Sequence, residues 1–208
     1  MRLDVLNING EKTGRTVELP SNVFGIEPNE HAVYLAIKLY LANQRQGTHK
    51  SKERSEISGS TRKLHKQKGT GGSRKGDINS PLFPGGGRVF GPRPRDYSFS
   101  LNKKVRALAR KSVLSVKASE GKIMVVEDIK LDTPKTKQYI KILSNLNASK
   151  VRSIVLVGED SSNVYLSSRN VQKTKVSLAQ GASTYDLLNA QAIIISESAL
   201  SAFQSSND

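Results

Sequence analysis

Residues 122–128 have the sequence KIMVVED, in which four apolar residues lie between a lysine and two acids. The stretches 153–157 (SIVLV) and 192–195 (AIII) are also almost continuously apolar. Strands that are apolar on both faces are typical of parallel sheets covered by helices on both sides. The intervals between these three stretches contain helical patterns, so the sequence predicts an α/β domain with a mostly parallel sheet.

Further elements are predicted on either side of these strands. Asn9-Gly10 is a strong hairpin signal between two candidate strands, 2–8 and 13–19. Another short strand is predicted at 173–176. Helices are predicted at 28–43, with Pro28 in the first turn; at 103–117, with Asn102 as N-cap; from Thr133-Pro134 onward; at 162–169; at 184–189; and at 197–203, with Ser196 as N-cap.

Residues 45–100 differ in composition from the rest of the chain. They hold 10 of the 16 glycines and 4 of the 7 prolines, but only nine apolar residues. A segment so poor in apolar side chains cannot offset its ordering entropy by burial. We therefore expect one globular domain, formed by residues 1–44 and 101–208. Residues 45–100 are expected to be a long extended loop inserted in this domain, which becomes ordered on a partner.

Positive charge is concentrated in the same part of the chain. Residues 45–118 contain 19 Lys and Arg against 4 Asp and Glu, which accounts for the whole net charge of +15. The four acids are expected to form local ion pairs or turn caps; they are Glu53, Glu56, Asp77 and Asp96. Such a surplus favours a polyanionic partner, to which lysine and arginine bind with release of counterions. A long glycine-rich strip without a recognition helix favours RNA over DNA.

The predicted helix at 103–117 continues the basic surface. One stripe is apolar, and it consists of Val105, Leu108, Ala109, Val113 and Val116. Cations occupy most of the remaining positions, with no acid among them; they are Lys103, Lys104, Arg106, Arg110, Lys111 and Lys117. This pattern is typical of a helix that packs on one face and offers the other to an anion.

The aromatic residues of the loop allow two interpretations. They are Phe83, Phe90, Tyr97 and Phe99. Their rings can stack on unpaired bases, as aromatic side chains do in proteins that bind single-stranded RNA. They can equally seal the returning arm of the loop onto the protein. The sequence leaves both interpretations open.

Several classes of function are excluded by what the sequence lacks. There is no cysteine, so disulfides, thiolate-bound metals and thiol catalysis are excluded. His31, His49 and His65 lack metal-ligand spacing. Gly71 and Gly76 have the spacing of a phosphate loop, but Asp77 follows where that loop needs lysine. Gly158 is followed by Glu159 and Asp160, which would repel a phosphate. We therefore expect no cofactor, no metal and no catalysis. No apolar run approaches the roughly 18–20 residues needed to span a bilayer. An anionic membrane surface is the second candidate for the positive charge after nucleic acid, and we expect no membrane partner.

Several motifs along the chain resemble the family of bacterial large-subunit ribosomal protein four (the universal L-four family). They are Arg45-Gln46-Gly47-Thr48, Gln67-Lys68-Gly69-Thr70-Gly71, Gly85-Gly86-Gly87-Arg88, Gly91-Pro92-Arg93-Pro94-Arg95-Asp96-Tyr97, Asn102-Lys103-Lys104-Val105, Val125-Val126-Glu127-Asp128 and Pro134-Lys135-Thr136-Lys137. The resemblance implies a three-layer α/β/α domain and a structural role in the large ribosomal subunit in the cytoplasm, with early assembly among its functions. It implies as partners the ribosomal RNA, neighbouring large-subunit proteins and the nascent peptide. No homo-oligomer is expected.

Candidate binding residues follow from the charge and from this resemblance. The candidate rRNA-binding residues are the cations Arg45, Lys50, Lys52, Arg54, Arg62, Lys63, Lys66, Lys68, Arg74, Lys75, Arg88, Arg93, Arg95, Lys103, Lys104, Arg106 and Arg110. Because the globular domain, the helix and the loop stem (45–54 and 88–95) hold most of the cations, we expect most counterion release there. The resemblance places the tip of the loop on the wall of the peptide exit tunnel; this tip comprises Lys68, Gly69, Thr70 and Gly71.

Two other functions remain as alternatives. One is an RNA-modifying enzyme built on a Rossmann-like domain, for which the sequence lacks a glycine-rich loop after a strand. The other is a DNA-compacting protein, which would bind random duplex DNA as tightly as structured RNA.

Overall fold

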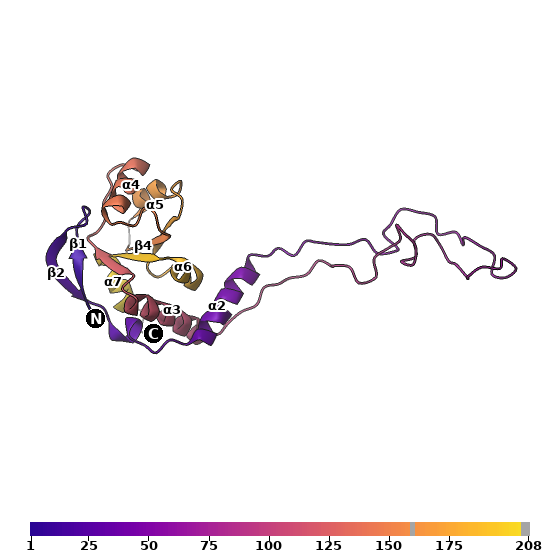
Figure 1. Ribbon diagram of the computed structural model, residues 1–208, viewed down its shortest axis with the longest axis horizontal. Coiled ribbons are helices and arrows are strands. Elements are labelled where there is room, and N and C mark those ends of the chain that lie inside the picture. Colours follow the sequence, from indigo (N-terminus) through magenta and orange to yellow (C-terminus); the bar gives the residue numbers. More distant parts are fainter. Residues whose placement is uncertain (159–160, 205–208) are drawn as a thin grey trace. The chain divides into compact units, whose positions relative to one another are not determined.

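The computed structural model describes residues 1–158 and 161–204. The chain divides into two compact units, one of Met1–Leu41 with Ser100–Asp208 and one of Ala42–Phe99. We call the first the globular unit and the second the basic unit. Figure 1 shows the path of the chain through both. Between Asn43 and Lys103 the described chain forms no helix or strand.

The globular unit is built on one six-stranded sheet in the order β2-β1-β3-β6-β4-β5. The strands are β1 (Arg2–Leu6), β2 (Lys12–Glu18), β3 (Ile123–Val126), β4 (Ser153–Val157), β5 (Thr174–Leu178) and β6 (Ala192–Ser196). β1 and β2 form an antiparallel hairpin, and all other neighbouring strands are parallel. The prediction of a mostly parallel sheet is therefore confirmed, with β3, β6 and β4 at its centre.

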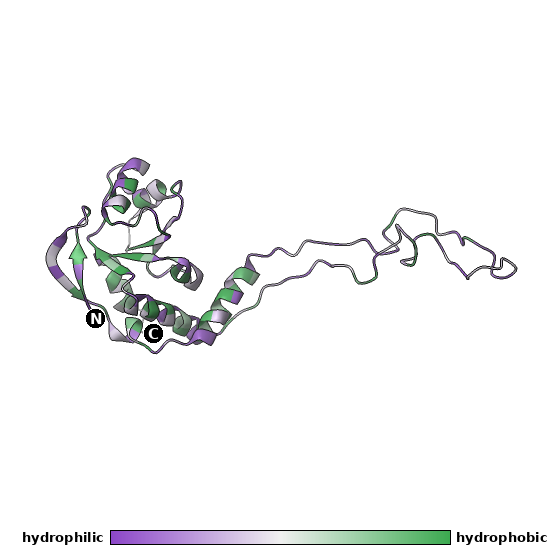
Figure 2. Cartoon of the chain, viewed as in Figure 1, coloured by the Kyte–Doolittle hydropathy of each residue, from purple (hydrophilic) through white to green (hydrophobic). Residues whose placement is uncertain are grey.

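Helices cover both faces of this sheet, which gives three layers (Figure 1). Successive residues of β3 point to opposite faces: Val125 belongs to one core and Val126 to the other. The first core is closed by α1 (Ser21–Phe24), α3 (Lys103–Ser119), α6 (Thr184–Asn189) and α7 (Glu197–Gln204). The second is closed by α4 (Thr136–Asn145) and α5 (Ser162–Ser168). In Figure 2 the strands between the two helical layers are mostly green, as buried strands should be.

A separate small cluster joins α2 (Glu30–Asn43) to α3. It consists of the buried alanines Ala32, Ala36 and Ala109, with Val33 and Val105 packed against them. Small side chains let two helices approach closely. The helix that leads into the basic unit and the helix that follows it in sequence are thus neighbours within the globular unit.

Two predicted helix starts, those of α2 and α4, were wrong, whereas α3 and α7 begin where predicted but lack the expected caps. α2 begins at Glu30 rather than Pro28, since the Asn29 side chain accepts a hydrogen bond from the Ala32 amide at 2.9 Å. At α7 the side chain of Asp128 caps the helix, because it accepts a hydrogen bond from the Ser198 amide at 3.0 Å. Ser196 was expected to be this N-cap. Asn102 precedes α3 but its side chain makes no capping bond. The helix expected from Thr133-Pro134 begins at Thr136, and the single turn α1 was not predicted.

The predicted apolar stripe of α3 is only partly correct. Ala109 and Val113 are buried as expected, but Leu108 is 39% exposed, whereas Leu114 and Lys117 are buried. The helix is covered on two sides, because the segment between α1 and α2 also packs on it. In this contact the Ser112 hydroxyl accepts a bond from the Asn29 amide, at 3.1 Å, and the Ser115 hydroxyl accepts one from the Ile26 amide, at 3.2 Å. The Lys117 ammonium donates to the Ala190 carbonyl at 2.8 Å, and burial lowers the pKa of Lys117.

Tyr139 of α4 is fully buried under the sheet, and its hydroxyl lies 2.9 Å from the Thr174 hydroxyl of β5. Burial raises the pKa of Tyr139 to about 12, because the phenolate would lose its hydration. In the unfolded chain a tyrosine ionises near pH 10.

We predict that Tyr139→Phe makes stability less dependent on alkaline pH. Between pH 10 and about 12 the folded state of the wild type holds one more proton than the unfolded state, so its free energy of unfolding falls as pH rises. The variant lacks this contribution and should show a shallower slope in denaturant titrations across that range. At neutral pH it should be less stable by about 1 kcal/mol, because Thr174 loses its partner. An unchanged alkaline slope would contradict the prediction.

Candidate nucleic-acid interface

The basic unit consists of two arms that run in opposite directions and are joined by backbone hydrogen bonds. The amides of Arg95, Ser51 and Arg88 donate to the carbonyls of Gly47, Pro92 and Lys52 at 3.2, 2.9 and 3.0 Å. Further out, the amide of Leu64 donates to the carbonyl of Gly76 at 3.0 Å. These isolated bonds fix the register of the two arms without forming a strand ladder.

Glycines allow the arms to approach this closely. Gly47 has φ +67°, and a Cβ there would lie 2.0 Å from the Arg95 carbonyl oxygen. A Cβ at Gly87 would lie 2.3 Å from the Arg54 amide nitrogen. Any other residue would force the arms apart at either position, and at Gly47 the positive φ also favours glycine.

The four acids of the basic unit are all engaged within it. Glu53 pairs with Arg93 at 2.5 Å, Glu56 with Lys50 at 2.5 Å, and Asp77 with Arg54 at 2.9 Å. Asp96 accepts bonds from the Ser98 amide and hydroxyl at 2.8 and 2.6 Å, as in a turn cap. These contacts lower the pKa of Glu56, mainly through Lys50, and that of Asp96 through Ser98. The prediction of local ion pairs and turn caps is confirmed.

Tyr97 joins the two arms near their base. The Arg45 guanidinium lies 3.6 Å from the ring centroid and that of Arg95 4.4 Å, while the hydroxyl lies 3.1 Å from His49 Nε2. Such cation–π contacts stabilise a structure by about 0.5–1 kcal/mol each at exposed sites. For Tyr97 the structure therefore supports the sealing interpretation. No local sequence pattern signals this contact, since its partners come from both ends of the segment.

These contacts change where free positive charge is found. Of the stem cations, Lys50, Arg54 and Arg93 are ion-paired and Arg45 and Arg95 lie on Tyr97, which leaves Lys52 and Arg88. By contrast, residues 57–76 contain six cations and no acid. Three of these cations line a 450 Å³ hollow together with the Arg54–Asp77 ion pair; its full lining is Arg54, Thr61, Lys63, Gln67, Arg74, Lys75, Gly76 and Asp77. Fewer cations of the stem than of residues 57–76 therefore lack an acidic or aromatic partner in the described chain. That most counterion release occurs at the globular domain, the helix and the stem stays a prediction.

The tip of the basic unit is fully accessible. Lys68, Gly69, Thr70 and Gly71 are all exposed. Gly69 and Gly71 have φ values of +80° and +64°. A Cβ added at either residue would have no atom of the described chain within 4 Å, apart from those of the glycine itself and its chain neighbours. A side chain at either position would thus be strained by the backbone conformation and not by a neighbour.

The four candidates on α3 fall into two kinds. Lys103, Lys104 and Arg106 are exposed at the start of the helix. Arg110 instead points into the globular unit, where its guanidinium donates to the carbonyls of Ala179 and, at 2.8 Å, Gln180. Burial lowers the pKa of Arg110. Arg110 thus holds the segment after β5 against α3, and its contact with RNA stays a prediction.

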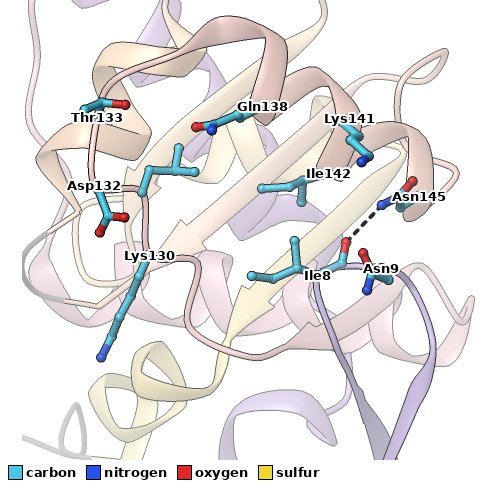
Figure 3. Close-up of a pocket in the computed structure, with 10 residues that line it drawn as sticks. Ile8, Asn9, Lys130, Asp132, Thr133, Gln138, Lys141, Ile142 and Asn145 are labelled. Carbon is cyan, nitrogen blue, oxygen red and sulfur yellow. Dashed lines mark hydrogen bonds between the residues drawn. The ribbon is translucent and has the colours of Figure 1, made fainter.

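The globular unit has a cavity of 290 Å³ between the hairpin turn, the segment after β3 and α4 (Figure 3). Asn145 donates a bond of 3.4 Å across it to the Ile8 carbonyl. Its lining holds two lysines, Lys130 and Lys141, and one carboxylate, Asp132, but no histidine to act as a base. Within the described residues, no group of three or more His, Asp or Glu is placed to hold a metal ion.

Gly158 follows β4, at the position where a Rossmann-like enzyme would bind a phosphate. Packing explains why a glycine is found there. A Cβ at Gly158 would lie 2.5 Å from the Ser198 hydroxyl, so the glycine permits close packing of α7. Glu159 and Asp160, expected to repel a phosphate, lie outside the described residues. Across the described chain, no helix combines the length and apolar character needed to cross a membrane.

Comparison with known proteins confirms the resemblance. The model of the ribosomal protein L4/L1 family matches residues 17–206. The chain is 55% identical over 204 residues to the large ribosomal subunit protein uL4 of Phocaeicola vulgatus, covering 98% of each chain. It is 58% identical over 200 residues to that of Parabacteroides distasonis, covering 96% of each, and 55% identical over 205 residues to that of Christiangramia forsetii, covering 99% of each. The chain belongs to the ribosomal protein L4/L1 family.

Proposed function

We propose that the chain is a structural, non-catalytic constituent of the large ribosomal subunit, bound to ribosomal RNA in the cytoplasm. The observation that carries this proposal is the state of charge in the basic unit. Its thirteen cations face four carboxylates, and all four are already engaged within the unit. The remaining surplus needs an external polyanion. The names of the relatives, each a large ribosomal subunit protein, agree with RNA as that polyanion.

Binding divides between two kinds of cation. Arg54 and Arg93 by ion pairs, and Arg45 by its contact with Tyr97, hold the two arms together, so they shape the unit before RNA arrives. Lys52, Arg62, Lys66, Lys68, Arg74 and Arg88 have no acidic partner among the described residues and are available to phosphates. Since each neutralised phosphate releases counterions, affinity comes from many such contacts together. An extended unit of this kind can join RNA segments that are distant in sequence, which suits an early role in subunit assembly.

The tip of the basic unit, Lys68 to Gly71, is proposed to line the nascent-peptide exit tunnel. Small residues and positive φ values suit a narrow passage, and the tip makes few contacts of its own. The nascent peptide would then be a transient neighbour, and other large-subunit proteins would be permanent ones. We propose no membrane partner and no homo-oligomer.

Charge reversal at the start of α3 should weaken RNA binding without unfolding the protein. In Lys103→Glu with Lys104→Glu and Arg106→Glu, three exposed cations are lost, so the salt slope of log K should become shallower by about 2–3. The measurement is filter binding to large-subunit ribosomal RNA at several salt concentrations. The matched control reverses the exposed Lys135, Lys137 and Lys141 on the opposite side of the sheet, which should have little effect.

Two outcomes would contradict this prediction. Melting that falls as much as binding would show that the α3 face is structural. Equal affinity of the wild type for random duplex DNA would support the DNA-compacting alternative.

Substitutions at the tip should alter tunnel properties more than assembly. Lys68→Glu changes one of six distal cations, so large subunits should still form. Gly69→Val should strain the backbone at φ +80°, whereas Gly72→Val, at a residue without positive φ, serves as the control. Cells carrying only the mutant protein are tested for subunit profiles and for susceptibility to drugs that bind in the tunnel. Loss of large subunits with unchanged drug response would contradict the assignment of the tip to the tunnel wall.

A further inference from the structure

Phe90 is the most exposed large apolar side chain of the described residues, at 99%. The other aromatic rings of the basic unit have partners or partial cover: Tyr97 lies between Arg45 and Arg95, Phe83 lies under Lys75 at 5.5 Å, and Phe99 is 37% exposed. Among the described residues, neither a ring nor a cation lies against Phe90. Leaving such a ring in water forgoes the stabilisation that burial would give.

The backbone on either side of Phe90 is fixed by the opposite arm. The Arg88 amide donates to the Lys52 carbonyl at 3.0 Å, and the Ser51 amide donates to the Pro92 carbonyl at 2.9 Å. Between these bonds, a Cβ at Gly91 would lie 2.5 Å from the Ser51 side chain and 2.8 Å from Arg88 Cγ. The chain beside Phe90 is therefore packed closely against the other arm, while the ring itself is directed into solvent.

The charge around the ring indicates what covers it. Arg88 and Lys52, which form the adjacent bond between the arms, have no acidic partner among the described residues. An apolar ring beside unpaired cations suits a partner that has both a flat apolar face and a negative charge. An unpaired nucleotide has both, because its base stacks on aromatic rings and its phosphate pairs with arginine or lysine.

We propose that Phe90 stacks on an unpaired base of the ribosomal RNA, with Arg88 and Lys52 on the adjoining phosphates. This inference rests on the proposed function. It adds a stacking site for a base to the contacts that the cations make with phosphates. The bonds between the arms on either side of Phe90 limit the ordering entropy that is lost when the base arrives. Every base has a π face, so stacking itself places no requirement on which base it is.

The test compares side chains of different shape and chemistry at position 90 in the full chain, by binding to a bacterial large-subunit ribosomal RNA transcript. Phe90→Ala and Phe90→Leu should lower affinity by about 5- to 150-fold, the range found for loss of one stacked base. Phe90→Tyr and Phe90→Trp should keep it. The salt slope should stay the same in all four, because no phosphate contact is lost. Leu82→Ala is the control, since Leu82 is 90% exposed in the same unit but has no π face, and it should bind as the wild type does.

A second readout uses the absence of tryptophan from the chain. Phe90→Trp introduces a single tryptophan, whose fluorescence should be quenched when RNA binds and the base stacks. Normal affinity of Phe90→Leu, or unquenched fluorescence in the RNA complex of Phe90→Trp, would overturn the proposal and favour an apolar pocket of a neighbouring protein. An equal loss in Leu82→Ala would also overturn it. Failure of the wild type to bind the transcript would instead reject the proposed function.

Discussion

The structure depends on one physical constraint: the cations of the basic unit repel one another, and the unit has no hydrophobic core to hold them together. The basic unit has thirteen cations, four carboxylates and almost no buried side chain. Burial therefore cannot hold its arms together, and the contacts between the arms are of other kinds. Ion pairs, one tyrosine between two guanidinium groups, and glycines at the points of closest approach take the place of a core. Exposed ion pairs contribute at most about 1 kcal/mol each, so the unit is organised without being strongly stable.

The globular unit must fold independently of the conformation of the basic unit. Its two cores lie on the faces of a mostly parallel sheet, and all the residues that form them come from outside the basic unit. The contact of Ala32 and Ala36 with Ala109 holds α2 beside α3. The insertion between them then costs mainly the entropy of closing a loop, which grows slowly with its length. A long basic segment can thus be carried by a stable domain at a modest cost in stability.

Sequence reasoning succeeded where one local pattern determines the outcome. The apolar strands β3, β4 and β6 and the lack of regular structure in the basic segment follow from composition, as does the engagement of its four acids. It failed where a residue is determined by something distant in the chain. Asp128 caps α7, Lys117 reaches the Ala190 carbonyl, and Arg110 holds the carbonyls after β5. In each case the partner is about seventy residues away, and no local pattern signals it. The particular partners of Arg54 and Arg93 could not be predicted for the same reason, since their ion pairs join separate arms.

Amide hydrogen exchange, measured on the free protein and on its complex with ribosomal RNA, tests the central claim most directly. If burial holds the globular unit and charge holds the basic unit, amides of β3, β4 and β6 should exchange slowly in both samples. Amides of residues 57–76 should exchange quickly in the free protein, because almost none is hydrogen-bonded or buried, and should become protected in the complex. Strong protection through residues 60–90 in the free protein would show that the basic unit has a stable fold of its own, and would contradict the account.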